Sequence, residues 1–117
     1  MKAINLSEKL NLFSDQWTLK IITHLDDNHV YLTKIEGEFI WHSHGGQDEI
    51  FIVIEGRFRM DFRDRSESVE KGEELLVPKG LVHRPCAEEE CKLLASKKRI
   101  PTTPASKKKP DEKKVMK

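Results

Sequence analysis

Short runs of strand-forming residues fill the chain from Trp17 to Ala95. Within most runs, apolar and β-branched positions alternate with polar ones, and Gly, Pro, Asp or Asn separates neighbouring runs. Many short strands at close spacing, with little helix between them, predict an all-β fold built as an antiparallel sandwich or barrel. The runs are 17–25, 29–37, 39–44, 49–55, 57–63, 67–70, 74–78 and 91–95.

Turn-forming residues predict how these strands connect. The polar cluster 26–28 separates the first two runs and predicts a β-hairpin. Gly72 predicts a later turn, and Pro78 with Gly80 predicts another, directly before the last strands of the fold.

Composition divides the chain into three parts. Residues 1–16 form an N-terminal extension, in which Asn5 or Ser7 can cap a short helical turn. Residues 17–96 hold the strand runs and form the β-domain. Residues 97–117 are rich in Lys, Pro, Ser and Thr and poor in large apolar residues, so a disordered basic tail is predicted there.

The formal net charge of +1 hides an asymmetry between these parts. The tail from Lys97 carries nine basic and two acidic residues, a net charge of +7, while residues 1–96 are net −6. A basic face on the folded part is therefore not supported, and nucleic-acid binding is not expected.

No apolar stretch reaches the ~20 residues that a membrane helix needs, so no membrane association is expected. The first ten residues lack the long apolar region of a secretion signal. Cys86 and Cys91 are the two cysteines, and they are interpreted as buried or half-buried thiols in a reducing compartment. A cytoplasmic location is therefore predicted.

A cluster of polar residues interrupts the apolar runs near the middle of the chain. His42 and His44 lie one residue apart, and because alternate side chains of a strand share a face, both point to the same side. By the same alternation, Phe39 and Trp41 point away from them. Glu49 opens the next strand. A buried charge is costly unless it is paired or bound to a metal, so this cluster indicates a functional site.

The strand that begins at Glu49 is apolar on both faces. Glu49 and Val53 share one face, and Ile50, Ile52 and Ile54 share the other. An antiparallel sheet normally leaves one face to water. The isoleucines therefore predict an interface between two copies of the chain, a homodimer.

The segment 37–56 resembles the first motif of the cupin superfamily, which is written G-x5-H-x-H-x3,4-E-x6-G. The first interval is one residue short here, and every other interval fits. In this sequence the motif reads Gly37, four residues, His42, Ser43, His44, four residues, Glu49, six residues and Gly56.

The segment 72–87 resembles the second cupin motif, G-x5-P-x-G-x2-H-x3-N. The terminal Asn of the motif is absent here, and that Asn is not a metal ligand in the family. The resemblance covers roughly residues 17–95 and is to small single-domain bacterial cupins, including those described as similar to mannose-6-phosphate isomerase. In this sequence the motif reads Gly72, five residues, Pro78, Lys79, Gly80, two residues, His83, three residues and then Ala87 in place of Asn.

The resemblance implies a small antiparallel jelly-roll β-barrel with metal ligands at His42, His44, Glu49 and His83. Three imidazoles and one carboxylate suit a divalent Fe, Mn, Ni, Cu or Zn ion. His24 and His29 lie next to the predicted hairpin turn and have no partner at ligand spacing, so both are interpreted as structural.

Two functions remain open at this point. The first is a metal-dependent enzyme acting on a small organic molecule, with dioxygenase or isomerase chemistry. The second is a non-catalytic module that binds a small ligand or sugar, with or without a metal. Fold alone does not choose between them.

Overall fold

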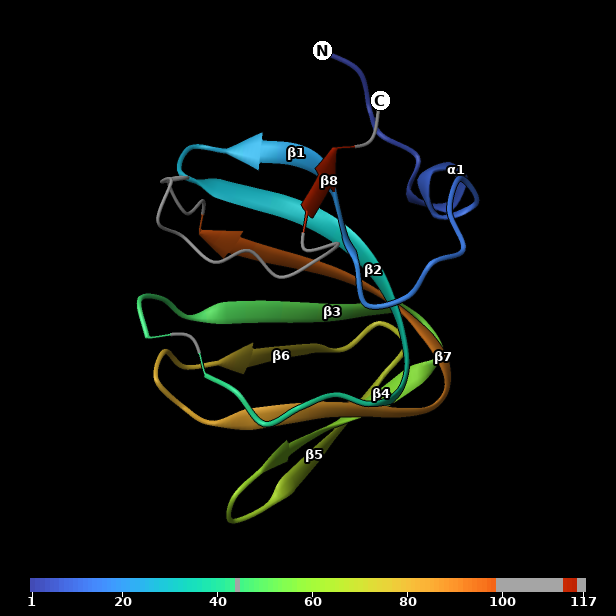
Figure 1. Ribbon diagram of the computed structural model, residues 1–117. Helices are drawn as coiled ribbons and strands as arrows, with labels where there is room; N and C mark the ends of the chain where they lie inside the picture. Colours follow the sequence, from blue (N-terminus) through green and yellow to red (C-terminus); the bar gives the residue numbers. More distant parts are fainter. Residues whose placement is uncertain (44, 99–112, 116–117) are drawn as a thin grey trace.

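The computed structural model describes residues 1–43 and 45–98 and the backbone of residues 113–115 (Figure 1). The prediction of an all-β jelly-roll fold is confirmed, because nearly every strand pairing is antiparallel and the single helix has five residues. The elements are α1 (Leu6–Leu10), β1 (Leu19–Leu25), β2 (Asn28–Glu38), β3 (Glu49–Glu55), β4 (Arg57–Phe62), β5 (Ser66–Glu70), β6 (Glu74–Val77), β7 (His83–Lys98) and β8 (Lys113–Val115).

Strand β7 is the central strand of the fold. Along one edge it pairs with β2, from Asn28 opposite Lys98 to Glu38 opposite Cys86. Its other edge pairs first with β4, near the N-terminal end of β7, and then with β3. Strand β5 continues the sheet beyond β4, β6 continues it beyond β3, and β1 continues it beyond β2. Figure 1 shows these strands wrapping around one interior.

Strands β3 and β4 act as one long strand that bends at Gly56. Both run antiparallel to β7, and Gly56 lies between them with φ of +87°. A Cβ atom placed at Gly56 would lie 2.9 Å from the carbonyl oxygen of Glu90 and 3.1 Å from the Cα of Cys91. Glycine is needed here both for the left-handed backbone and for this close approach.

The interior is filled by side chains that alternate along these strands. Leu93, Val53 and Met60 are almost fully inaccessible to solvent, and burial of each such side chain contributes about 1.5–3 kcal/mol. Cys91 belongs to this core, and its burial raises the pKa of the thiol to about 12. The rest of the main cluster is Ile35, Phe58, Phe62, Val69, Val77 and Ala87.

The connections predicted from turn residues are confirmed. Strands β1 and β2 form an antiparallel hairpin around Asp26, which has φ of +53°. The turn before β7 closes with a hydrogen bond from the Leu81 amide to the Pro78 carbonyl, and Gly80 there has φ of +79°. Asn5 caps α1, since its side-chain oxygen accepts a hydrogen bond from the Glu8 amide.

The N-terminal extension packs against β1 and β2. Leu10 is buried, and the ring of Phe13 lies 4.6 Å from the ammonium nitrogen of Lys34 and 5.3 Å from that of Lys20. Lys34 also donates to the carbonyl of Phe13, and Lys20 forms a 2.8 Å ion pair with Asp15. We call residues 5–18 the N-terminal strap.

Two boundaries differ from those expected. Residues 39–43 form no strand, because β2 ends at Glu38; they join the sheet through a bridge at His42 and a hydrogen bond from the Phe39 amide to the Pro85 carbonyl. Strand β7 begins at His83 rather than at residue 91, since pairing with β2 and β4 extends it past the acidic residues 88–90.

The predicted disordered tail is only partly covered by the structure. Residues 97 and 98 complete β7, and residues 113–115 form β8, parallel to β1. For these residues the structure differs from the prediction, because backbone pairing with an open strand edge does not depend on apolar side chains. Residues 99–112 and 116–117 lie outside the described residues. In the part of the chain that is described, no helix has the length and apolarity to cross a bilayer.

Replacing Gly56 by Ala is expected to lower the free energy of unfolding by about 1–3 kcal/mol, because the new methyl group meets the β7 backbone at a positive φ. Urea denaturation followed by circular dichroism measures the change. Gly46→Ala is the matched control, since a Cβ at Gly46 would have no atom within 4 Å. Equal stabilities of the two variants would contradict the requirement for glycine at the bend between β3 and β4.

Candidate functional site

His42 and His83 lie side by side at one end of the barrel. The His42 amide donates to the His83 carbonyl at 3.0 Å, and the His83 amide donates back to the His42 carbonyl at 2.8 Å. This reciprocal pair joins the segment after β2 to the first residue of β7. The two imidazole centroids are 4.4 Å apart. The structure therefore brings together two histidines that are 41 positions apart in the sequence.

Both imidazoles are oriented by a backbone carbonyl two residues earlier. Nδ1 of His42 lies 2.9 Å from the carbonyl oxygen of Ile40, and Nδ1 of His83 lies 2.8 Å from that of Leu81. Because a carbonyl oxygen only accepts, each Nδ1 carries the proton. In the neutral ring Nε2 then holds the lone pair, which is the arrangement in which histidine binds a metal.

Glu49 faces the same interior from the start of β3. Its side chain is buried, and one carboxylate oxygen, Oε1, lies 3.8 Å from Nε2 of His83. Burial lowers the pKa of His83, although the hydrogen bond to the Leu81 carbonyl acts in the opposite direction. The buried imidazole is therefore neutral at physiological pH, which is the form that can coordinate a cation.

Tyr31 is a further polar residue of this interior that the sequence reasoning missed. Burial, and secondly the nearby Glu49 carboxylate, raise the pKa of its phenol above the ordinary value, so that the hydroxyl keeps its proton. Tyr31 lies on β2 opposite Ala95, and both are buried. The alternation of side chains along 29–37 would have placed Tyr31 inside the barrel.

The four residues implied by the two motifs are thus only partly described. His83 lies beside His42 and 3.8 Å from Glu49, while His44 lies outside the described residues. Across residues 1–43 and 45–98, no group of three or more His, Cys, Asp and Glu residues is arranged to hold a metal ion. The donor chemistry nevertheless fits a divalent transition metal, because both imidazoles hold Nδ1 against a carbonyl and so keep Nε2 as a donor, and Nε2 of His83 lies 3.8 Å from the Glu49 carboxylate.

The segment that carries His42 is held from its outer side by a charged cluster. The ring of Trp41 lies 4.1 Å from the guanidinium of Arg63 and 4.7 Å from that of Arg84. Arg84 in turn donates to the buried carboxylate of Asp61, which also accepts a hydrogen bond from Arg59 at 2.6 Å. Trp41 therefore points away from the histidines, in agreement with the sequence alternation.

Phe39 does not follow that alternation. Its ring meets the His42 ring edge-on, with centroids 5.3 Å apart and planes at 88°. The strict alternation fails because residues 39–43 are not a regular strand. Phe39 thus belongs to the surroundings of the site.

His24 and His29 lie on the β1–β2 hairpin, and the interpretation of both as structural stays a prediction. They face each other across the β1–β2 hairpin, with ring centroids 4.8 Å apart.

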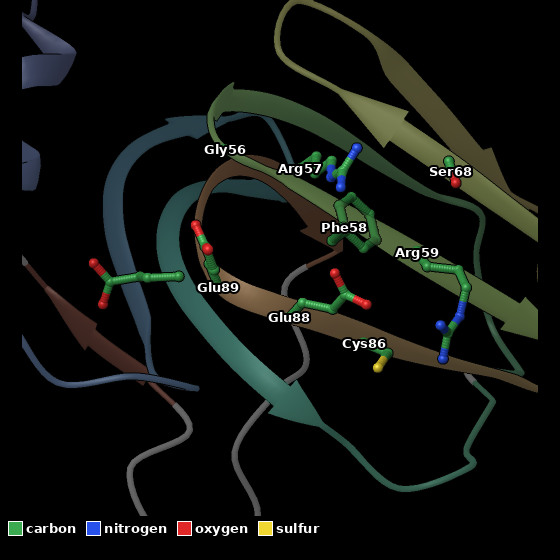
Figure 2. A pocket seen from close by; sticks show the side chains of 9 residues that line it. Gly56, Arg57, Phe58, Arg59, Ser68, Cys86, Glu88 and Glu89 are labelled. Atoms are coloured by element: carbon green, nitrogen blue, oxygen red, sulfur yellow. The ribbon is translucent and has the colours of Figure 1, made fainter.

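A separate hollow of about 360 Å³ lies on the outer side of β4 and β7. Figure 2 shows arginines projecting from β4 and acidic residues projecting from β7, with Ser68 on β5 beyond them. Its charges are mixed, and it contains none of the residues at the histidine end. The lining residues are Gly56, Arg57, Phe58, Arg59, Ser68, Cys86, Glu88, Glu89 and Glu90.

Comparison with known proteins identifies the class to which this fold and this histidine end belong. A family model for the cupin domain, Cupin_2, matches residues 29–96. The chain belongs to the cupin domain family. The match includes every residue of the two motifs.

Individual relatives agree with this assignment. A cupin-2 domain containing protein from Shewanella frigidimarina is 42% identical, with a TM-score of 0.81 over 82% of this chain and 94% of that one. A protein of Neisseria meningitidis is 32% identical, with a TM-score of 0.75 over 81% of this chain and 97% of the other.

The uncharacterized protein YdbB of Bacillus subtilis is 45% identical over 64 residues, which are 54% of this chain. The match spans 57% of the length of that curated relative. These relatives do not test the likeness to mannose-6-phosphate isomerase, which stays a prediction.

Replacing Asp61 by Asn is expected to lower the free energy of unfolding at neutral pH by about 2 kcal/mol, because two guanidinium groups lose their anion. The figure lies below the range for fully buried pairs, since the Arg59 side chain is 42% exposed. Urea denaturation at neutral pH measures the change, and an unaltered midpoint would contradict it.

The Asp61→Asn variant also tests how the stability depends on pH. Hydrogen bonds from Arg59, and then from Arg84 and Ser66, hold the pKa of Asp61 far below its ordinary value. Because this pKa is lower in the folded state, the stabilisation is complete above the unfolded value of about 3.9 and is lost as pH falls below it. The difference in Tm between wild type and Asp61→Asn should therefore stay constant from pH 7 to about pH 5 and narrow as the pH falls below about 4.

Proposed function

We propose that this protein is a metal-binding single-domain cupin that acts on a small organic molecule. The metal ligands are His42, His44, Glu49 and His83, and the ion is a divalent transition metal. The observation that carries the proposal is the paired orientation of His42 and His83, in which each Nδ1–H group donates to a backbone carbonyl. Nε2 of His83 then lies 3.8 Å from the buried Glu49 carboxylate. Proteins of this family commonly bind transition metals, which supports the same reading.

The chain's own residues would divide the work at such a site. The carbonyls of Ile40 and Leu81 fix the tautomer and direction of the two imidazoles. Glu49 supplies the negative charge that a dication needs in a low-dielectric interior. The protonated phenol of Tyr31 can donate a hydrogen bond to an anionic or carbonyl group of a bound molecule.

A bound ion of this kind supplies Lewis acidity, polarising a carbonyl or activating water. The buried walls of the barrel limit the access of solvent to the histidine end, since His83 is 1% exposed and Glu49 is 5% exposed. Low access to water strengthens the electrostatic interactions between these groups and a small ligand.

The alternative function is a module that binds a small ligand without transforming it. It is favoured by the small number of acid–base groups around the site, where Tyr31 is the one residue added by the structure among those described. Dioxygen uptake by the Fe(II)-loaded protein with catechols, thiols and diketones separates the two. Uptake with any of these substrates identifies an oxygenase.

Metal content tests the proposed centre directly. Protein purified without added metal or chelator should contain a transition metal by elemental analysis. Glu49→Gln and His83→Ala should each bind that metal at least about tenfold more weakly, because each loses a donor. Competition with a coloured chelator measures the affinity.

His24→Ala is the matched control for these variants, because His24 lies on the hairpin and should leave the affinity unchanged. Unchanged affinity in Glu49→Gln would remove that carboxylate from the ligand set. A wild-type chain that binds no transition metal would reject the metal centre.

We infer further that two copies associate through the outer face of β3 and its neighbours. Ile50 and Ile52 are half-buried there, and Ile50 pairs with Leu76 of β6, whose side chain is 54% exposed. Leu94 of β7 lies opposite Ile52 and is also half-buried. An apolar face of several strands exposed to water usually marks an interface.

Size-exclusion chromatography with light scattering should give the wild-type protein the mass of a dimer at micromolar concentration. Leu76→Glu should shift it to the monomer mass, because a carboxylate would be buried unpaired at the interface. Leu25→Glu is the control: Leu25 is 60% exposed at the hairpin and lies away from that face. A monomeric wild type would contradict the interface.

A further inference from the structure

Trp17 has a backbone conformation that a bulky residue rarely adopts. Its φ is +62°, in the left-handed region. Two hydrogen bonds hold it there: its amide donates to the carbonyl of Lys34 at 2.8 Å, and its indole Nε1–H donates to the carbonyl of Glu36 at 3.1 Å. Strained residues persist only where their surroundings fix them, and they gather at functional sites.

The indole of Trp17 connects the N-terminal strap to the end of the barrel that holds His42 and His83. It stacks on the ring of Phe39, with centroids 4.9 Å apart and planes at 14°. Phe39 then meets the His42 ring edge-on, and its amide donates to the carbonyl of Pro85 on β7. The strap, the segment 39–43 and β7 are thus joined by one row of rings.

His42 needs such support more than His83 does. His83 is buried and is the first residue of β7, where it pairs with Phe62 of β4. His42 is only half-buried and lies in a segment that is not a strand, held to β7 by the bridge to His83 and by the hydrogen bond from the Phe39 amide to Pro85. Its imidazole direction therefore depends on the groups that pack against it.

We propose that Trp17 and Phe39 are positioning residues for the His42 imidazole, through which the N-terminal strap controls metal binding. The proposal rests on the metal centre proposed above. The strap is itself anchored. Asp15 forms an ion pair with the buried Lys20, and the ammonium group of Lys34 donates to the carbonyl of Phe13 and lies over its ring. Loss of the indole would leave Phe39 without its stacking partner and the His42 ring with less restraint.

The test uses Trp17→Leu and Phe39→Leu, which remove one ring each and keep an apolar side chain. Phe39→Tyr keeps the ring and serves as the conservative variant. Val69→Ala is the control for lost stability, because Val69 is buried on β5, in the core and outside this row of rings. All variants are made in the full chain.

Two readouts are taken, one of them without metal. In metal-free protein, ¹H–¹⁵N NMR of the imidazoles should show His42 of the wild type as the Nδ1–H tautomer. Trp17→Leu and Phe39→Leu should populate both tautomers. Added Co(II) should bind these two variants about tenfold more weakly than wild type, with an altered visible spectrum. Phe39→Tyr and Val69→Ala should retain the wild-type affinity and tautomer.

The outcomes separate the two proposals. If the wild type binds no Co(II), the metal centre is rejected, and the NMR readout still decides the positioning. Wild-type His42 signals in both leucine variants would overturn the positioning role. An equal loss of Co(II) affinity in Val69→Ala would show that general destabilisation causes the effect, and would also overturn it.

Discussion

Pairing of β7 with three other strands is the constraint on which the rest of the structure depends. One edge is occupied by β2, and the other by β3 and β4 in turn. Every backbone group inside the barrel needs a partner, since an unpaired buried amide or carbonyl lowers the free energy of unfolding by about 1–3 kcal/mol. The bend at Gly56 lets β3 and β4 follow one strand around a corner, and the close contact with the Glu90 carbonyl leaves no space for a side chain there.

The chemistry at the barrel end follows from where β7 begins. Its first residue, His83, is drawn into the interior by pairing on both sides, and the turn at Gly80 supplies the carbonyl that orients its ring. Burial lowers the pKa of that imidazole and keeps it neutral. Its Nε2 lies 3.8 Å from the carboxylate of Glu49, which is buried in the same interior. Desolvation would be unfavourable for these groups in isolation, and a cation that binds both would offset it.

The outer side of the barrel supports the inner side. The segment 39–43 has little sheet pairing, and it is held by aromatic and charged contacts instead. Trp41 is packed against Arg63 and Arg84, and Phe39 is packed against Trp17. Because Arg84 also binds the buried Asp61, a single carboxylate links the hairpin β4–β5 to the neighbourhood of His42.

The sequence by itself determined most of the strands, the hairpin, the turns and the cupin family, because alternation and turn chemistry are local properties of the chain. It also selected Glu49 and His83, since the motif spacings are local too. Tertiary structure decided the rest: the contact of Phe39 with His42, the inward phenol of Tyr31 and the packing of the N-terminal strap. These arise between segments far apart in the chain, where irregular backbone breaks the alternation from which a side chain's direction is read.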